Sequence, residues 1–241
     1  MAKSEGISLF SGLSTVVPPR GIDKNFVLCY NENDTNPWRI PMKKLLITGF
    51  DPFGGADRNP SREAVMALPS VIGNCEITPL EIPTIFGLAA DTVLRVAREL
   101  CPDVIICVGQ AAGRAAITPE VVGINLRNAS IPDNAGNQPS HTPVVGGAPA
   151  AYFSTLPVRE MVAAVQASGL PCSLSYSAGV FVCNDLLYTL LHHFDGTTTR
   201  VGFIHIPCLP EQAKEGCPSL PLHDIVRGLT AAIEAIAAAE S

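Results

Sequence analysis

The stretch Asp103-Val104-Ile105-Ile106-Cys107-Val108-Gly109 decides the fold class that this sequence predicts. Five apolar residues stand between an aspartate and a glycine, which is the pattern of a strand that is covered on both faces. Such strands occur in sheets that carry helices on each side. We therefore expect an α/β protein built around this segment.

Segments on both sides of this strand alternate between strand and helix patterns. Further strands are expected at Lys44 to Thr48, Glu76 to Ile82 and Val201 to Pro207. Helices are expected at Pro60 to Leu68, Gly87 to Leu100, Leu156 to Ser168 and Leu222 to Ala239. The repeated order of strand, helix and strand predicts a three-layer α/β/α sandwich.

The composition indicates one large domain. With 241 residues and 47% hydrophobic content, the chain can bury a sizeable core. Its 16 Lys and Arg residues against 22 Asp and Glu residues give a net charge of −6, so no polybasic face and no nucleic-acid partner are expected. The apolar runs are much shorter than the roughly 20 residues that span a bilayer, so no membrane segment is expected.

The eight cysteines are scattered through apolar runs, in a chain too large to need disulfide staples. They include no Cys-x-x-Cys pair, and the histidines show no ligand spacing around them, so we expect reduced thiols and no metal site. Reduced thiols favour a cytoplasmic location.

The first 41 residues differ from the rest and are expected to form a poorly ordered leader or extension before a folded domain over residues 42–241. They contain Pro18-Pro19-Arg20-Gly21 and a polar run from Asn31 to Asn36, with no sustained periodicity. Ile7 to Val17 is mildly apolar, but serines and a glycine interrupt it, which argues against a secretory signal.

A cysteine opens a predicted helix within Ser175 to Asp185. The residues before Cys183 are small and strand-like, and Leu186, Leu187 and Leu190 follow it at helical spacing. Cys183 is therefore expected in the first turn, among unpaired backbone N–H groups that lower a cysteine pKa from about 8.5 toward neutrality. The sequence thus predicts a nucleophilic thiolate, although a buried structural cysteine is the commoner role of such a residue taken alone.

Two other segments supply the groups that a cysteine nucleophile needs. His205 lies inside the apolar run Val201 to Pro207, and Glu120 leads directly into the apolar run Val121 to Leu126. Taken singly, these residues are more often a satisfied core histidine and a charge at a strand end. Together with Cys183 they provide a general base and an orienting carboxylate for acyl transfer through a thioester.

Five ordered blocks of the sequence, between about Met42 and Leu229, resemble the type I pyroglutamyl peptidases, also called pyrrolidone-carboxylate peptidases. The blocks are Leu46 to Gly55 with Asn59-Pro60-Ser61, Val108 to Ala111 with Ile117 to Glu120, Ile131 to Asn134 with Gly136 to Pro139, Ser175 to Asn184, and Gly202 to Pro207. The resemblance implies a cysteine peptidase that removes an N-terminal pyroglutamyl residue from peptides. It assigns Cys183 as nucleophile, His205 as base and Glu120 as the carboxylate that orients the histidine.

The same resemblance implies a twisted mixed sheet, a homodimer or homotetramer, and catalysis without metal or cofactor. Phe50 and Phe53, with Phe181 beside the nucleophile, suit a small flat apolar ligand better than a phosphate, and they resemble walls of the family's pyroglutamyl pocket. Backbone groups near Gln110, or the Asn59 side chain, are expected to meet the N–H and C=O of the lactam ring.

Two positions depart from the family pattern. Many members have a basic residue straight after the glutamate, where this chain has Val121, and an arginine before Ile131, where it has Ser130. A missing cation weakens charge stabilisation in the transition state. Arg127 lies three residues before Ser130, and in a strand its side chain would point to the opposite face, so it is not expected to compensate. Two alternatives therefore stay open: a catalytically weakened pyroglutamyl-binding relative, and a nucleoside phosphorylase-like enzyme on a similar fold.

Overall fold

A six-stranded mixed sheet forms the centre of the computed structural model, which describes residues 42–214 and 216–239. The predicted leader over residues 1–41 lies outside the described residues. The strand order is β2-β3-β1-β4-β8-β5. The strands are β1 (Lys43–Phe50), β2 (Val71–Ile72), β3 (Cys75–Ile82), β4 (Val104–Gln110), β5 (Thr118–Pro119) and β8 (Arg200–Ile206).

The four long strands are parallel, and the two short edge strands run against them. β1 pairs in parallel with both β3 and β4, and β4 pairs in parallel with β8. β2 is antiparallel to β3, and β5 is antiparallel to β8. A second, two-stranded sheet consists of β6 (Val122–Ile124) and β7 (Ala151–Phe153).

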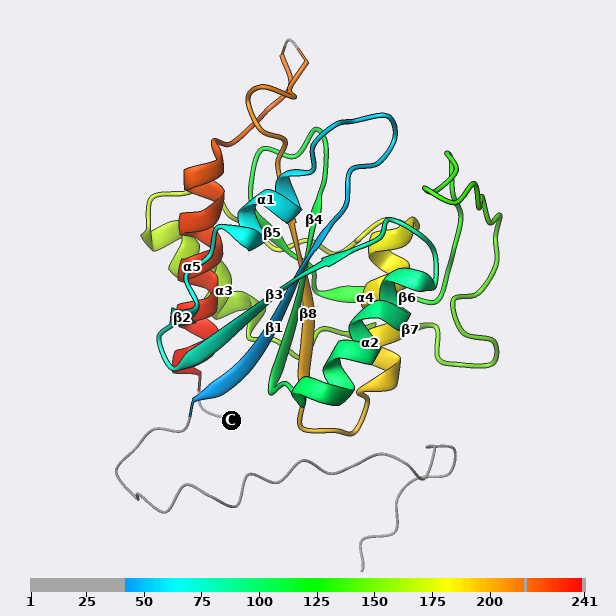
Figure 1. The fold of residues 1–241 in the computed structure, drawn as a ribbon, viewed down its shortest axis with the longest axis horizontal. Coiled ribbons are helices and arrows are strands. Elements are labelled where there is room, and N and C mark those ends of the chain that lie inside the picture. Colours follow the sequence, from blue (N-terminus) through cyan, green and yellow to red (C-terminus); the bar gives the residue numbers. More distant parts are fainter. Residues whose placement is uncertain (1–41, 215, 240–241) are drawn as a thin grey trace, which may run out of the picture. The chain divides into compact units, whose positions relative to one another are not determined.

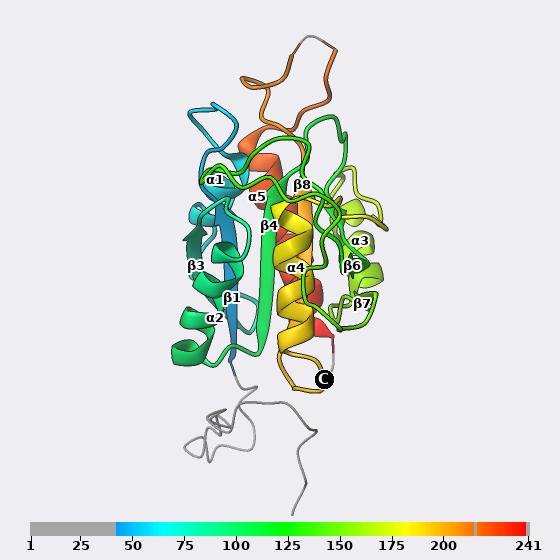
Figure 2. The same cartoon turned by 90° about the vertical axis from the view of Figure 1, so that its right-hand side faces the viewer.

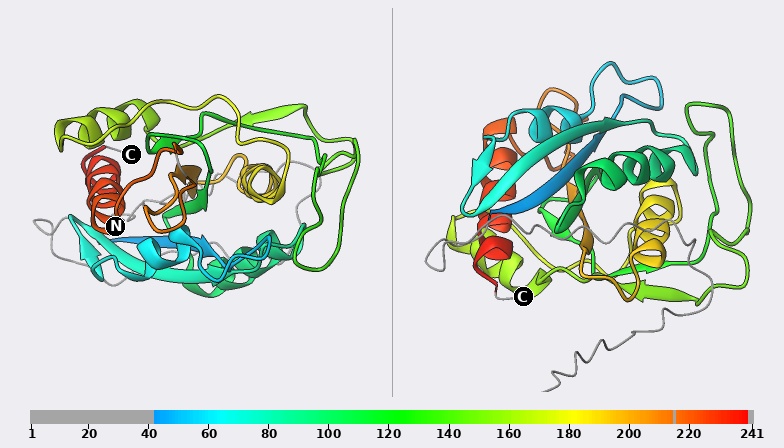
Figure 3. Two further views of the ribbon diagram at one scale, coloured as in Figure 1. Left: turned by 90° about the horizontal axis from the view of Figure 1, so that it is seen from above. Right: turned by 60° about the horizontal axis from the view of Figure 1, so that its bottom comes forward.

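Helices cover both faces of the large sheet (Figure 1). One face carries α1 (Pro60–Met66), α3 (Val158–Ala167) and α5 (Leu222–Ala238), and the other carries α2 (Leu88–Leu100) and α4 (Val182–His193). In Figure 2, α4 stands in front of β4 and β8, and Figure 3 shows the strands between α5 and α4. The predicted three-layer sandwich with a mixed sheet is confirmed.

The central strands are apolar on both faces because each face packs against a different helix layer. Along β4, Val104 and Ile106 belong to the core under α1, α3 and α5, whereas Ile105 and Cys107 belong to the core under α2 and α4. Side chains along a strand alternate between faces, so only a continuous apolar run satisfies both layers.

The strand-like run expected after Glu120, from Val121 to Leu126, contains the strand β6, and a separate short strand, β5, precedes Glu120. β5 ends at Pro119, and the next two residues form hydrogen bonds to different parts of the chain. Glu120 N–H donates to the Phe203 carbonyl in β8 (2.8 Å), and Val121 N–H donates to the Ser175 carbonyl (2.7 Å). Proline has no N–H to donate, which suits it to this short edge strand. These hydrogen bonds fix Glu120 beside β8.

None of the helices in residues 42–214 and 216–239 is long and apolar enough to cross a bilayer. Six cysteines of this part of the chain are free, namely Cys75, Cys107, Cys172, Cys183, Cys208 and Cys217. Cys101 is not among them.

Replacing Gly49 with alanine is expected to destabilise the fold. A Cβ atom there would lie 2.5 Å from the Ser61 carbonyl oxygen and 2.6 Å from the Arg62 Cα, both in α1 and both backbone. Because backbone must shift, we expect a loss of about 1–3 kcal/mol in the free energy of unfolding, measured by urea denaturation. Gly146→Ala is the control, since nothing lies within 4 Å of its added Cβ, and it should change stability by less than about 0.5 kcal/mol. Equal stability of both variants would contradict the close packing of β1 on α1.

Candidate active site

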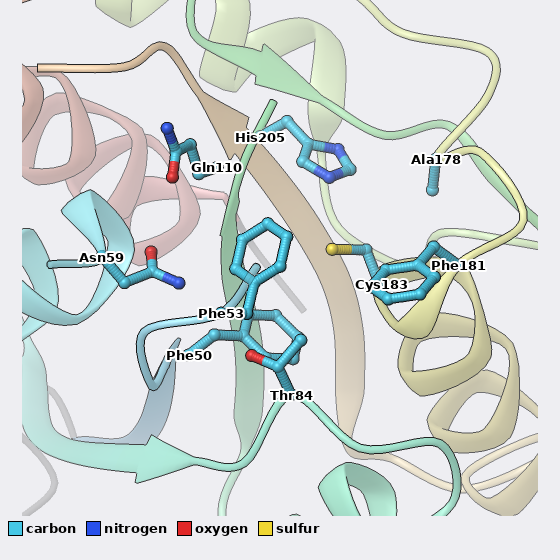
Figure 4. Close-up of a pocket in the computed structure, with 9 residues that line it drawn as sticks. All are labelled: Phe50, Phe53, Asn59, Thr84, Gln110, Ala178, Phe181, Cys183 and His205. Carbon is cyan, nitrogen blue, oxygen red and sulfur yellow. The ribbon is translucent and has the colours of Figure 1, made fainter. Parts of the chain in front are cut away.

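A small pocket lies at the carboxyl ends of the parallel strands, where α/β sheets usually bind ligands (Figure 4). Phe50 and Gln110 end β1 and β4, and His205 is the last but one residue of β8. The cavity volume is about 150 Å³, the volume of about five water molecules. Its lining consists of Phe50, Phe53, Asn59, Thr84, Gln110, Ala178, Phe181, Cys183 and His205.

Cys183 is the second residue of α4, as the sequence predicted. Phe181 precedes the helix in an extended conformation, makes no side-chain cap, and accepts the first helical hydrogen bond from Asp185 N–H (3.1 Å). The N–H groups of Val182, Cys183 and Asn184 thus have no acceptor within the helix. They form a set of donors for an anion beside the sulfur.

The sulfur lies close against β4 because position 109 has no side chain. A Cβ at Gly109 would be 3.1 Å from the Cys183 Sγ and 2.8 Å from the Phe203 ring. In Figure 4 the Cys183 sulfur and the His205 imidazole extend toward the same part of the pocket from opposite sides.

His205 and Glu120 form a buried hydrogen bond behind the pocket. The His205 Nδ1 lies 2.6 Å from the Glu120 Oε1, and the two side chains are 5% and 0% exposed. The pairing of β5 with β8 sets this contact, since Thr118 stands opposite His205 in the register. Because Nδ1 is held by the carboxylate, Nε2 is the ring nitrogen left for the pocket.

Arg114 is a member of the site that sequence reasoning missed. Its Nη1 donates to the Glu120 Oε1 (2.8 Å) and to the Thr118 Oγ1 (2.6 Å). Arg127, the cation that the sequence considered, instead donates to the Asp185 carboxylate through its Nε. Arg114 precedes Glu120 by only six residues, but no periodic pattern shows that its side chain folds back onto the carboxylate.

Burial and hydrogen bonding decide whether each of the two partners is charged. Burial tends to raise the pKa of Glu120, but contacts with His205, Ser175 and Arg114 outweigh it and hold this pKa below its usual range. Burial lowers the pKa of His205, in spite of the neighbouring carboxylate. The pair therefore consists of an ionised Glu120 and a neutral His205 at pH 7.

The expectation of a thiolate at Cys183 is wrong for the resting site. Burial, followed by the neighbouring Glu120 and Cys107, raises the pKa of Cys183 to about 12. Arg114 and a backbone hydrogen bond lower this pKa, but they do not outweigh the desolvation. The sulfur is therefore a thiol that must lose its proton to a base as it reacts.

All five residues that the sequence assigned to the pocket wall lie in its lining. The Phe181 ring contacts Phe53 (centroids 6.4 Å apart) and meets Phe86 edge-on (5.2 Å). Gln110 donates through Nε2 to the Cys208 sulfur (3.0 Å). None of the described residues donates to its Oε1, which is therefore an available acceptor.

Asn59 has a structural role besides its place in the pocket. Its Oδ1 accepts hydrogen bonds from the Ser61 N–H (3.0 Å) and Oγ (2.9 Å), and its Nδ2 donates to the Asp51 carbonyl (2.9 Å). The side chain caps α1, and only one of its N–H groups remains for a ligand.

Thr84 and Ala178 also line the pocket and were not predicted. The block Ile131 to Asn134 explains how Thr84 is placed, because Asn134 N–H donates to the Thr84 carbonyl (3.1 Å) and Asn134 Nδ2 donates to the Pro52 carbonyl (2.9 Å). Asn134 thus joins these loops with one backbone and one side-chain hydrogen bond, which no sequence periodicity reveals.

No group of three His, Cys, Asp or Glu side chains within residues 42–214 and 216–239 is arranged to hold a metal ion.

Comparison with known proteins places these observations in a family. The family model for pyroglutamyl peptidases matches residues 43–239. A pyrrolidone-carboxylate peptidase of Levilactobacillus brevis is 51% identical over 202 residues, which cover 82% of this chain and 99% of the relative. One of Alkaliphilus oremlandii is 49% identical over 196 residues, covering 80% and 92%.

Solved structures agree with the sequence relatives. The crystal structure of pyroglutamyl peptidase I of Bacillus amyloliquefaciens has a TM-score of 0.80 and 45% identity, covering 82% of this chain and 98% of that one. A mutant pyrrolidone carboxyl peptidase of Pyrococcus furiosus has a TM-score of 0.77 and 37% identity, covering 80% and 97%.

An α/β sandwich with a cysteine, a histidine and a glutamate gathered at one pocket places the chain among the cysteine peptidases. It belongs to the pyroglutamyl peptidase family.

The raised pKa of Cys183 predicts how this thiol reacts with iodoacetamide. The alkylation rate should keep rising with pH above neutrality, because the thiolate is scarce at pH 7. Peptide mass spectrometry would follow Cys183, and the exposed Cys217 would serve as an internal reference. A rate at Cys183 that is already constant between pH 6 and pH 8 would show a preformed thiolate instead.

Proposed function

We propose that the chain hydrolyses the bond between an N-terminal pyroglutamyl residue and the rest of a peptide, with Cys183 as nucleophile, His205 as base and Glu120 as orienting carboxylate. The observation that carries these roles is the 2.6 Å contact between the buried Glu120 and His205, at a pocket that Cys183 also lines. Family membership supports the reaction.

The first half-reaction forms a thioester. The Cys183 thiol transfers its proton to the Nε2 of the neutral His205 as the sulfur attacks the carbonyl carbon that joins the pyroglutamyl residue to the next residue. Glu120 accepts a hydrogen bond from the Nδ1–H of His205 and stabilises the imidazolium that forms. The N–H groups at the start of α4 stabilise the negative oxygen of the tetrahedral intermediate. The C–N bond then breaks as the imidazolium gives its proton to the leaving amine nitrogen, and the thioester remains.

The second half-reaction regenerates the thiol. A water molecule gives a proton to His205 while its oxygen attacks the thioester carbon, and the C–S bond breaks. The sulfur regains the proton from the imidazolium, and free pyroglutamate leaves. No external oxidant, reductant or metal is needed to balance either step.

The pocket supports a pyroglutamyl ring as the specific group. Three phenylalanines supply flat apolar walls, and a cavity of about 150 Å³ suits one residue rather than a peptide. The Gln110 Oε1 would accept the lactam N–H, and the remaining Asn59 N–H would donate to the lactam carbonyl. A lactam has no charged amine, so it enters such walls without burying an ammonium.

The structure bears on the two alternatives. The uncharged residues Val121 and Ser130 suggested a catalytically weakened pyroglutamyl-binding protein. In the structure, however, Arg114 places a cation on Glu120 from a third position. Relatives about half identical to this chain are named as peptidases, which favours the peptidase over a binding protein. A nucleoside phosphorylase-like enzyme is set aside by the family match.

The cysteines and the exposed aromatic rings bear on the cellular setting and the assembly. Six free thiols favour a reducing compartment such as the cytoplasm. We also propose a homodimer or homotetramer, as the family resemblance implies, and the exposed rings of Phe153 and Tyr176 are candidate contact residues for it.

Replacing Cys183 with alanine is expected to abolish release of a fluorogenic amine from a pyroglutamyl amide, because no thioester can form. Cys217→Ala is the matched control, since this exposed thiol lies outside the pocket lining, and it should keep wild-type turnover. Turnover by the Cys183→Ala protein would refute the mechanism.

Prolyl amides are expected to be much poorer substrates than pyroglutamyl amides. A prolyl group carries a charged amine and lacks the ring carbonyl, so it would bury an ammonium and leave the Asn59 N–H unpaired. An unpaired buried group costs about 1–3 kcal/mol, so kcat/KM should fall by about 5- to 150-fold from this loss alone, and burial of the ammonium should lower it further. Comparable kcat/KM for the two amides would contradict the proposed pocket contacts.

A further inference from the structure

Arg114 joins three parts of the chain that meet behind the pocket. It follows β4 in a loop, and its Nη1 bonds to Thr118 in β5 and to the Glu120 carboxylate. Its Nη2 donates to the Ser177 carbonyl (2.9 Å), in the loop that leads into α4 and Cys183. The guanidinium therefore contacts the segments that carry the proposed carboxylate and the proposed nucleophile.

The two segments are also joined by backbone hydrogen bonds. Ser175 N–H donates to the Pro119 carbonyl (2.9 Å), and Val121 N–H donates to the Ser175 carbonyl (2.7 Å). Arg114 extends this pairing with a side chain that bears a full charge. Its three acceptors suit a planar fork of donors, which a lysine ammonium does not provide in the same geometry.

One oxygen of Glu120 receives both donors. The His205 Nδ1 and the Arg114 Nη1 both lie within hydrogen-bonding distance of Oε1, while no described residue bonds Oε2. A buried carboxylate beside a neutral imidazole lacks charge compensation from that partner. Arg114, which is 29% exposed, is the cation that compensates it.

We propose that Arg114 is a positioning residue, which fixes the Glu120 oxygen that orients His205 and holds the loop before Cys183 against it. This inference rests on the proposed function. It also explains how the site has a cation although Val121 and Ser130 stand where many relatives have basic residues.

The charges around the histidine give the sign of the pH effect. Glu120, directly after β5, and Arg114, in the loop before β5, act on His205, and Cys183 faces the pocket from α4. Glu120 raises the pKa of His205 and Arg114 lowers it. Removing the Arg114 charge should therefore raise the pKa of His205 and move the acid limb of kcat/KM to higher pH.

The experiment compares Arg114→Gln and Arg114→Lys in the full chain. For Arg114→Gln we expect kcat to fall about 10- to 100-fold, with KM nearly unchanged because Arg114 does not line the pocket. The acid limb should move up by about half to one pH unit. Arg114→Lys keeps the charge, so it should restore the acid limb while kcat stays lowered.

Arg127→Gln is the matched control. Arg127 is 26% exposed and pairs with the fully buried Asp185, as Arg114 pairs with Glu120, but it does not contact Glu120 or His205. Both Gln variants should lower the melting temperature, and only Arg114→Gln should shift the acid limb. The pH profile of Cys183 alkylation should shift in parallel, and it needs no peptide turnover, so it tests Arg114 even if Cys183→Ala disproves the proposed function.

A folded Arg114→Gln protein with wild-type kcat and acid limb would overturn the proposal. Equal shifts in the Arg114→Gln and Arg127→Gln proteins would overturn it too, because they would indicate a general loss of packing. Should Arg114→Gln fail to fold, Arg114→Lys decides, and a wild-type kcat in that variant would overturn the proposal.

Discussion

The buried hydrogen bond between Glu120 and His205 is the interaction on which the rest of the site depends. It forms because β5 pairs with β8 in a register that places Thr118 opposite His205, and because Glu120 N–H then bonds to Phe203. A carboxylate that is fully buried needs partners, since an isolated charge in a protein interior is strongly unfavourable. The sheet therefore supplies both the position of the histidine and the polar contacts that let the carboxylate remain ionised.

Burial also decides the protonation states of His205 and Cys183, because it favours the neutral form of each side chain. It keeps His205 neutral and Cys183 protonated, whereas the hydrogen bonds to Glu120 keep that group charged. A site of this kind starts from a neutral thiol and a neutral imidazole, so charge separation occurs during attack and not before it. Preorganised donors at the start of α4 are then most useful, because they act on the charge that develops.

The sequence predicted most of the fold and much of the site, for reasons that differ between residues. Continuous apolar runs such as Val104 to Val108 revealed the central strands, because both faces of the sheet are covered. Ordered motifs led to the proposal of Glu120, Cys183 and His205 as the catalytic residues. Arg114 and Thr84 were not predicted. The Arg114 side chain folds back onto Glu120, and Thr84 lies in a loop held by hydrogen bonds to a distant loop, and neither feature leaves a periodic pattern in the sequence. The acidity of Cys183 was misjudged since the sequence shows a helix start but not the depth of its burial.

The cation at this site illustrates why local sequence departures are weak evidence for lost chemistry. Val121 and Ser130 remove charges at two positions in the linear motif, yet the carboxylate senses any cation that reaches it in space. Arg114 does so from a loop that follows a different strand, and its contact with Ser177 links the carboxylate to the cysteine loop. A side chain in a loop between two strands therefore compensates the charge of Glu120, so an uncharged residue next to the glutamate in the sequence need not remove the function.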